Sequence, residues 1–380
     1  MIERSIVEAA ARLRRNREPH LVATVVRVCG AAYRKPGARM LLTHFRWITS
    51  AVSGGCLAGD TARDAWARTQ NGEPQLLSYD SAGDSDDDIR SAFGLGCDGA
   101  VEVLIERAGA PGRVDPLAFA SECLRKQKRG ALVTVIRSRV PEIKIGTRIA
   151  LQHGGEPMQD PLGDEILATA MIADARAALA SGESCHRSYT SACGSVDVFV
   201  EAILPPPRLF VFGTGHDALP LVQLAHGLGW DMTVCTNEAR ASTQQRFSQA
   251  DEILVGTPAE HAARIGDCDR AVAVVMSHHY DTDRENLGML IRSRARYIGV
   301  LGPRSRTTRM LNELYLVAQD DPRLHAPVGL ELGAETPHEI ALAIVAQIQA
   351  VLHKAGPDRI ADRPMPRITE AVAAALPVAS

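Results

Sequence analysis

The chain has 380 residues, of which 46% are hydrophobic, and a formal net charge of −3. This balance argues against a general nucleic-acid or anionic-membrane binder, because both need a basic excess. No apolar run approaches the roughly 18 residues that span a bilayer, and the segment after Met1 lacks the apolar core of a signal peptide. The eight cysteines contain no C-x-x-C pair, which disfavours zinc ribbons and ordinary iron–sulfur ligation. We therefore expect a reduced, cytoplasmic protein with free thiols.

The first part of the chain predicts an α/β domain that spans residues 1–204 and includes a middle segment at about 111–204. Periodicity and β-branched residues indicate the elements of this domain. No internal repeat is evident. The expected helices are at 2–13, 61–69, 116–127 and 166–180, and the expected strands at 20–29, 40–42, 47–52, 75–79, 100–106, 130–138, 147–152 and 196–204.

The proline run at 205–207 predicts a stiff linker and the clearest domain boundary. After it, strands and helices alternate regularly, which is typical of a parallel sheet with helices on both faces. We expect a Rossmann-like domain at 208–354 and a loosely ordered tail at 355–380. The predicted strands of the Rossmann-like domain lie at 208–212, 231–235, 252–255, 271–276 and 297–301. Its predicted helices lie near 217–228, 242–248, 259–265, 283–293 and 340–352.

A glycine-rich turn follows the first strand of this domain. Gly213, Gly215 and Ala218 match the G-x-G-x-x-A form of the dinucleotide fingerprint. Glycines let a phosphate approach the backbone closely, and the next helix offers free N–H groups. The turn therefore predicts a phosphate cradle, with His216 and Asp217 inside it.

Two cysteines lie in other glycine-rich loops. Cys56 follows Gly54 and Gly55, and Cys97 follows Gly96. Small neighbours leave a thiol uncovered, and nearby N–H groups stabilise a thiolate that can bind a soft metal or sulfur. A buried structural cysteine in a tight turn is the alternative, and the pattern leaves both open.

Polar residues also follow later strands of the Rossmann-like domain, where a ligand crevice is expected. The candidates are His278 or His279, and Arg304. The alternatives are a polar turn and a solvated helix start. The end of the second strand departs from the usual pattern, because Thr236 stands where an acid would hold a ribose. Glu238, two residues further on, could replace that acid. The departure nevertheless weakens the case for an NAD-dependent dehydrogenase.

Several stretches together resemble the XdhC/CoxI family of xanthine dehydrogenase accessory proteins. They run in family order from about residue 20 to 350 and lie at 36–40, 53–57, 94–99, 212–221, 297–302 and 328–341. The resemblance implies two α/β domains, usually in a dimer. It also implies binding of the molybdenum cofactor (molybdopterin), its protection during sulfuration and its transfer to an apo-hydroxylase. In such proteins a cysteine of the glycine loop that matches Cys97 is tied to the cofactor.

We therefore expect a carrier and insertion factor for the molybdenum cofactor, plain or in its nucleotide form. Cys97 is the expected metal contact. Apo molybdenum hydroxylase is the expected partner, with a cysteine desulfurase as a further candidate. An NAD(P)-dependent oxidoreductase is the alternative. The hydroxylase itself is excluded by the length of the chain and by the missing iron–sulfur cysteines.

Overall fold

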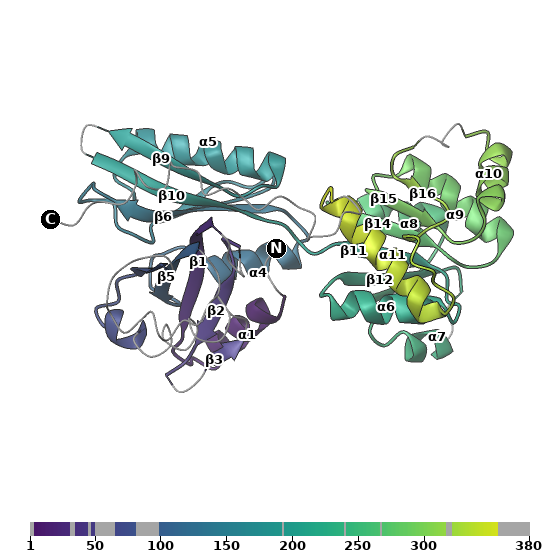
Figure 1. The fold of residues 1–380 in the computed structure, drawn as a ribbon, viewed down its shortest axis with the longest axis horizontal. Helices are drawn as coiled ribbons and strands as arrows, with labels where there is room; N and C mark the ends of the chain where they lie inside the picture. Colours follow the sequence, from purple (N-terminus) through teal and green to yellow (C-terminus); the bar gives the residue numbers. More distant parts are fainter. Residues whose placement is uncertain are drawn as a thin grey trace. The chain divides into compact units, whose positions relative to one another are not determined.

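The computed structural model describes residues 4–30, 35–44, 47–49, 65–80, 99–191, 194–238, 241–266, 268–316 and 321–355. The described residues divide into two compact units, one ending at Leu204 and the other beginning at Pro205. Each unit is an α/β assembly, so the predicted fold class is confirmed (Figure 1).

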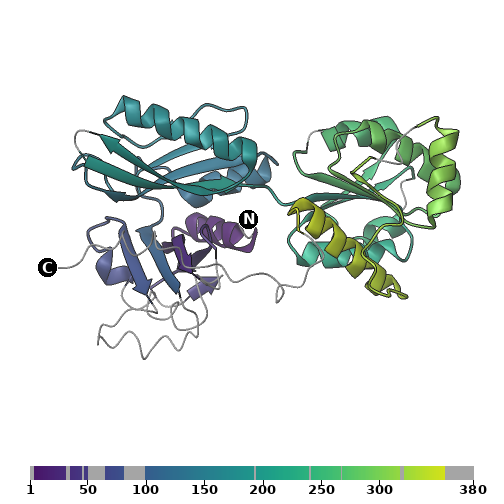
Figure 2. The same ribbon diagram turned by 45° about the horizontal axis from the view of Figure 1, so that its top comes forward.

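The first unit contains two antiparallel five-stranded sheets and the helices packed on them (Figures 1 and 2). Its first half comprises α1 (Arg4–Arg15), β1 (Leu21–Gly30), β2 (Arg39–Leu42), β3 (Trp47–Thr49), helical residues at 65–68, β4 (Gln75–Asp80) and β5 (Gly99–Arg107). Its second half comprises α4 (Pro116–Arg125), β6 (Gly130–Ser138), β7 (Arg148–Gln152), β8 (Met158–Gln159), α5 (Glu165–Ser181), β9 (Cys185–Ser191) and β10 (Gly194–Ile203).

The two halves are structural repeats of each other. The strand order is β3-β2-β1-β5-β4 in one sheet and β8-β7-β6-β10-β9 in the other, so each strand has an equivalent five places later. A helix precedes the first strand of each half, and another precedes the fourth. The expectation that the chain holds no internal repeat was therefore wrong.

Local details of the backbone repeat as well. The pairing of β1 with β5 shifts register between Val25 and Arg27, and the pairing of β6 with β10 shifts opposite Val135 and Arg137. The chain leaves α1 and α4 through residues of nearly equal positive φ, 54° at Arg17 and 53° at Gln127. Such agreement at irregular positions indicates a repeated architecture rather than two generic sheets.

Two buried ion pairs cross between the halves. Arg39 on β2 donates to both carboxylate oxygens of Glu201 on β10, at 2.7 and 2.5 Å. Arg148 on β7 donates in the same way to Glu106 on β5, at 2.7 and 2.5 Å. The arginine of each half thus pairs with the glutamate of the other, as expected for halves related by an approximate two-fold axis.

The core of the first unit lies in layers. Val26, Leu104, Ile136 and Phe199 form a buried cluster that joins the two sheets. The outer face of the β6–β10 sheet packs on α5, and the equivalent face of the other sheet packs on the helix at 65–68. A further cluster holds α1 and α4 together against both sheets.

The second unit has a six-stranded parallel sheet with strand order β13-β12-β11-β14-β15-β16. Helices α6 and α11 cover one face, whereas α8, α9 and α10 cover the other (Figures 1 and 2). The elements are β11 (Arg208–Phe212), α6 (Ala218–Gly227), β12 (Asp231–Thr236), α7 (Ala241–Arg246), β13 (Glu252–Val255), α8 (Pro258–Gly266), β14 (Ala271–Val275), α9 (Tyr280–Arg292), β15 (Tyr297–Val300), α10 (Arg304–Glu313), β16 (Leu324–His325) and α11 (Pro337–Leu352).

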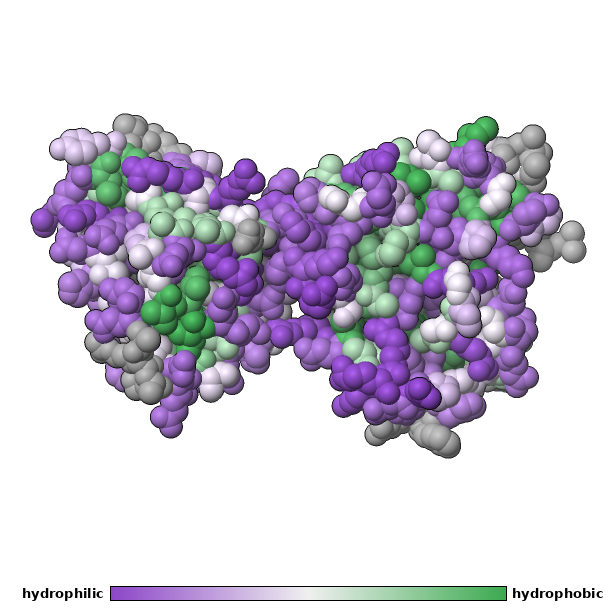
Figure 3. All heavy atoms as spheres, turned by 180° about the vertical axis from the view of Figure 1, so that it is seen from behind, coloured by the Kyte–Doolittle hydropathy of each residue, from purple (hydrophilic) through white to green (hydrophobic). Residues whose placement is uncertain are grey.

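All five strands predicted for this unit are present within a residue or so of the expected bounds. The predicted start of α11 is confirmed, because Thr336 and Glu339 form a reciprocal capping box. The short edge strand β16 was not predicted, and α10 begins at Arg304, where a solvated helix start was the alternative to a ligand contact. On the face drawn in Figure 3, hydrophobic residues form separate areas among hydrophilic ones.

Candidate functional site

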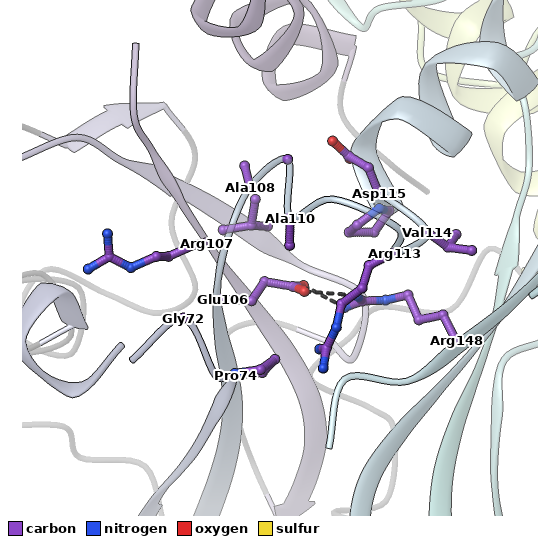
Figure 4. Close-up of a pocket in the computed structure, with 13 residues that line it drawn as sticks. Gly72, Pro74, Glu106, Arg107, Ala108, Ala110, Arg113, Val114, Asp115 and Arg148 are labelled. Carbon is purple, nitrogen blue, oxygen red and sulfur yellow. Dashed lines mark hydrogen bonds and ion pairs between the residues drawn. The ribbon is translucent and has the colours of Figure 1, made fainter. Parts of the chain in front are cut away.

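A small cavity in the first unit is too narrow for a cofactor. It lies beside the Arg148–Glu106 pair, with Arg113 and Pro74 on its wall (Figure 4). Its volume is about 20 Å³, which is room for a single water molecule. This cavity is therefore part of the crossed ion-pair structure rather than a ligand site.

A much larger cavity lies at the carboxyl ends of the parallel strands in the second unit. Its volume is about 520 Å³, within the range of small-molecule sites. The wall comes from the turns after β11, β12, β13 and β14 and from helices α7, α8 and α9. Among the lining residues are Phe212, Gly213, Thr214, Gly215, Cys235, Thr236, Asn237, Glu238, Thr243, Arg246, Gly256, Pro258, His261, Ser277, His279, Thr282, Glu285 and Asn286.

The predicted glycine turn forms one wall of this cavity, but its two glycines are needed for different reasons. Gly213 has a φ of +146°, and a Cβ there would lie 2.5 Å from the carbonyl oxygen of Met276. A Cβ on Gly215 would instead lie 2.7 Å from Asp217 Oδ1. Gly213 thus lets two strand ends meet, whereas Gly215 leaves room for a side chain of the site. Ala218 is fully buried where α6 begins.

The turns after β11 and β14 are joined by Asp217 and His278. His278 Nε2 lies 2.6 Å from Asp217 Oδ2. Asp217 occupies the N-cap position of α6 without capping it, and its Oδ1 is buried with no partner among the described residues. His278 has a φ of +62°, a left-handed conformation that is uncommon outside glycine and is often found at functional sites.

Asp283 fixes the turn that carries His278. This fully buried carboxylate accepts from the backbone N–H of Ser277 at 3.1 Å and from its hydroxyl at 2.5 Å. Its second oxygen accepts from Arg306 at 2.8 Å. The turn is therefore held from α9 and α10 before any ligand binds.

The far side of the cavity carries the residues after β12. The Thr236 hydroxyl is engaged with the backbone of Glu238, at 3.3 and 3.4 Å. Glu238 itself lines the cavity, and so does Arg246, which donates to the Gly215 carbonyl at 3.3 Å. Arg246 brings a guanidinium beside the glycine turn, where it suits an anionic group.

Helix α8 places His261 in the wall. Thr257 and Glu260 form a reciprocal cap, with Glu260 accepting from the Thr257 N–H at 2.7 Å and from its hydroxyl at 2.9 Å. These hydrogen bonds hold the pKa of Glu260 below its usual value. The ring of His261 packs edge-on against Phe212, with 5.5 Å between ring centres.

The structure brings together some of the predicted residues and separates others. Gly213, Gly215, Asp217, Ala218 and His278 lie together at one strand edge. Gly213 and Gly215 line the cavity, whereas five other described candidates do not: His216, Asp217, Ala218, His278 and Arg304. His216, His278 and Arg304 are exposed. The remaining predicted residues lie outside the described residues: Gly54, Gly55, Cys56, Gly96 and Cys97.

Sequence reasoning missed Arg246 and His261. A signal for His261 was present, because T-x-x-E after a predicted strand marks a helix start at the crevice. In the described part of the chain, no three His, Cys, Asp or Glu residues are grouped to hold a metal ion. The described helices also include none with the length and apolar character of a membrane span.

Two family models match the chain. One, the XdhC Rossmann domain, matches residues 209–348. The other, the XdhC and CoxI family, matches residues 13–80. The first match covers the unit with the large cavity, and the second lies within the first structural repeat.

Known proteins match over most of the chain. A protein of Bacillus subtilis that is named as a probable xanthine dehydrogenase component is 30% identical and aligns over 88% of this chain and 93% of its own length. "Molybdenum cofactor insertion chaperone PaoD" of Escherichia coli is 21% identical, over 88% of this chain and 84% of its own. A crystal structure described as a xanthine dehydrogenase from Bacillus halodurans superposes with a TM-score of 0.70 at 26% identity, over 96% of this chain and 99% of that one. The chain therefore belongs to the XdhC and CoxI family.

Proposed function

We propose that the chain binds the molybdenum cofactor and inserts it into a molybdenum hydroxylase of the xanthine dehydrogenase type. The observation that carries this proposal is the alignment over most of its length with a protein named as a molybdenum cofactor insertion chaperone. The cofactor supplies the redox chemistry of the client enzyme. The residues of this chain bind it and shield it from water.

The cavity of the second unit suits an anionic group such as a phosphate. The glycine turn and the start of α6 offer backbone N–H groups, which favour an anion. Arg246 adds a positive charge beside the same turn. Asp217 and His278 hold the two strand ends in place around it.

We also propose that a thiolate from a glycine-rich loop of the first unit contacts the molybdenum or its sulfur. Cys97, which follows Gly96 in the sequence, is the proposed metal contact. Cys56, beside Gly54 and Gly55, is the second candidate. A thiolate is a soft donor suited to this metal and to sulfur. The described residues alone offer no competing cluster.

This function requires particular partners. The recipient is an apo molybdenum hydroxylase, and a cysteine desulfurase would supply sulfur to the bound cofactor. We further propose that the protein is a cytoplasmic homodimer. Cross-linking and size-exclusion chromatography of the purified chain test the dimer.

The phosphate assignment is tested with two glycine variants purified from a cofactor-producing host. Gly215→Val places a side chain where Asp217 Oδ1 lies 2.7 Å from the new Cβ, so we expect the bound cofactor to fall sharply. Gly227→Val, in the same unit, meets nothing within 4 Å and is the matched control. If a natively folded Gly215→Val protein retained all of its bound cofactor, the cavity would not be part of the cofactor site.

An NAD(P)-dependent oxidoreductase is the second candidate, because Glu238 lines the cavity near the position of the missing ribose acid. The hydrogen bonds between the Thr236 hydroxyl and the backbone of Glu238 argue against an oxidoreductase. Calorimetry with NAD and NADP, combined with a hydride-transfer assay on alcohols and aldehydes, separates the two functions. Tight nucleotide binding together with turnover would favour the oxidoreductase.

A further inference from the structure

His261 is a buried polar residue in the cavity wall that the proposed function does not use. It is 3% exposed, yet it lines the cavity. Neither of its ring nitrogens has a hydrogen-bond partner among the described residues. A buried donor or acceptor without a partner is costly, so it marks a place where a ligand supplies the missing bond.

The surroundings of His261 keep its ring neutral. Burial lowers the pKa of the imidazole. A ring nitrogen approaches the backbone of Leu254, which opposes part of this shift, but the approach lacks hydrogen-bond geometry. A neutral imidazole presents one donor and one acceptor. It therefore suits an uncharged group that carries both.

Several residues that line the cavity together with His261 suit a flat, largely apolar ring. The aromatic ring of Phe212, the buried thiol of Cys235 and Pro258 line the same cavity. Burial raises the pKa of Cys235, so this thiol stays uncharged. The glycine turn and Arg246 form another part of the same cavity wall and suit an anion. The cavity wall thus includes uncharged aromatic and apolar groups as well as groups that suit an anion.

We propose that His261 selects the ligand of this cavity by hydrogen bonding to the edge of a nitrogen heterocycle that carries a phosphate. This inference deepens the proposed function, because it assigns a ligand class to the same cavity. Two sources share this chemistry, namely a nucleobase in a nucleotide and a pterin. Both are flat and present adjoining donors and acceptors.

The first experiment measures affinity by calorimetry with the full chain and four probes. They are cytidine monophosphate, guanosine monophosphate, neopterin monophosphate and ribose 5-phosphate, which lacks the heterocycle. We expect at least one heterocyclic phosphate to bind more tightly than ribose 5-phosphate. The nucleotides and the pterin phosphate distinguish the two sources. Equal affinity for all four probes would overturn the inference.

Variants then test His261 directly. His261→Leu is expected to lower the affinity for the heterocyclic probe by about tenfold and to leave the affinity for ribose 5-phosphate unchanged. His261→Gln keeps a donor and an acceptor, so it should retain most of the preference and remains informative if the leucine variant does not fold. His325→Leu is the matched control, because His325 Nε2 is also buried without a partner but the residue does not line the cavity.

The outcomes also separate this inference from the proposed function. If His261→Leu folds and keeps full preference for the heterocyclic probe, the inference fails. Molybdenum cofactor bound to the purified wild-type chain would still support the proposed function in that case. If the wild type selects a heterocyclic phosphate but never holds molybdenum, the proposed function fails and the assignment of His261 stands.

Discussion

The two halves of the first unit share a scaffold but differ in the sequence between their strands. Residues 81–98 separate β4 from β5, whereas residues 192–193 alone separate the equivalent β9 and β10. Residues 50–64 lie in the sequence between β3 and the described helical residues 65–68, whereas 160–164 lie between β8 and α5. The crossed ion pairs and the bulges are the same in both halves.

The difference between the halves indicates which segments carry the function. Residues that both halves share maintain the two-sheet scaffold. The longer segments of the first half hold both glycine–cysteine loops, with Cys56 and Cys97. We therefore expect cofactor binding to depend on the first half, and stability to depend on both halves alike.

The largest expected effect concerns the loop cysteines. In a cofactor-producing host, Cys97→Ser should reduce bound molybdopterin and molybdenum by about tenfold or more, because a serine hydroxyl is a poor soft donor. Pterin fluorescence and elemental analysis of the purified protein measure the loss. Cys56→Ser should lose less.

Cys185→Ser is the matched control from the second half, since Cys185 is a free thiol on β9. It should retain the cofactor like the wild type. A selective loss in Cys56→Ser would move the assignment to that loop. If Cys185→Ser lost as much cofactor as Cys97→Ser, cofactor binding would not depend on the first half in particular.

A large effect on stability is expected from the crossed ion pairs. Glu106→Ala and Glu201→Ala each leave a buried guanidinium without its partner, which costs about 3–5 kcal/mol. Both pairs have side chains that are 3% and 8% exposed, so we expect the two variants to lose similar stability in urea. A large loss in one and none in the other would show that the halves are not equivalent.

The smallest expected effect comes from two glycines that follow helices. Gly72 and Gly182 have φ of +77° and +73°, and a Cβ fits at both without a clash. Alanine at either position should therefore cost about 1–2 kcal/mol, from backbone conformation alone. Gly155→Ala, with ordinary φ, is the control and should change thermal unfolding little. If the two alanine variants lost unequal stability, the equivalence of the two halves would hold for the strands but not for the turns after the helices.

The Rossmann-like unit could be predicted closely, because its signals are local. Strands and helices alternate with clear periodicity, and the turn at Gly213 has a fixed spacing. The repeat in the first unit was missed because its markers are sparse. Lys35, Gly37 and Arg39 recur as Lys144, Gly146 and Arg148, but the residues between them differ.

The candidate site was predictable only in part, for a similar reason. The glycine fingerprint identifies the turn, and strand ends identify His278. By contrast, no motif marks the helix that carries Arg246, and the T-x-x-E pattern before His261 marks only where its helix begins. Their role follows from burial and from tertiary contacts, which periodicity does not report.

The central claim is that this chain binds the molybdenum cofactor. Its most direct test is the pterin fluorescence and molybdenum content of wild-type protein purified from a cofactor-producing host. We predict both in comparable molar amounts, and loss of both in Cys97→Ser but not in Cys185→Ser. Well-folded wild-type protein that contains neither pterin nor molybdenum would contradict the account.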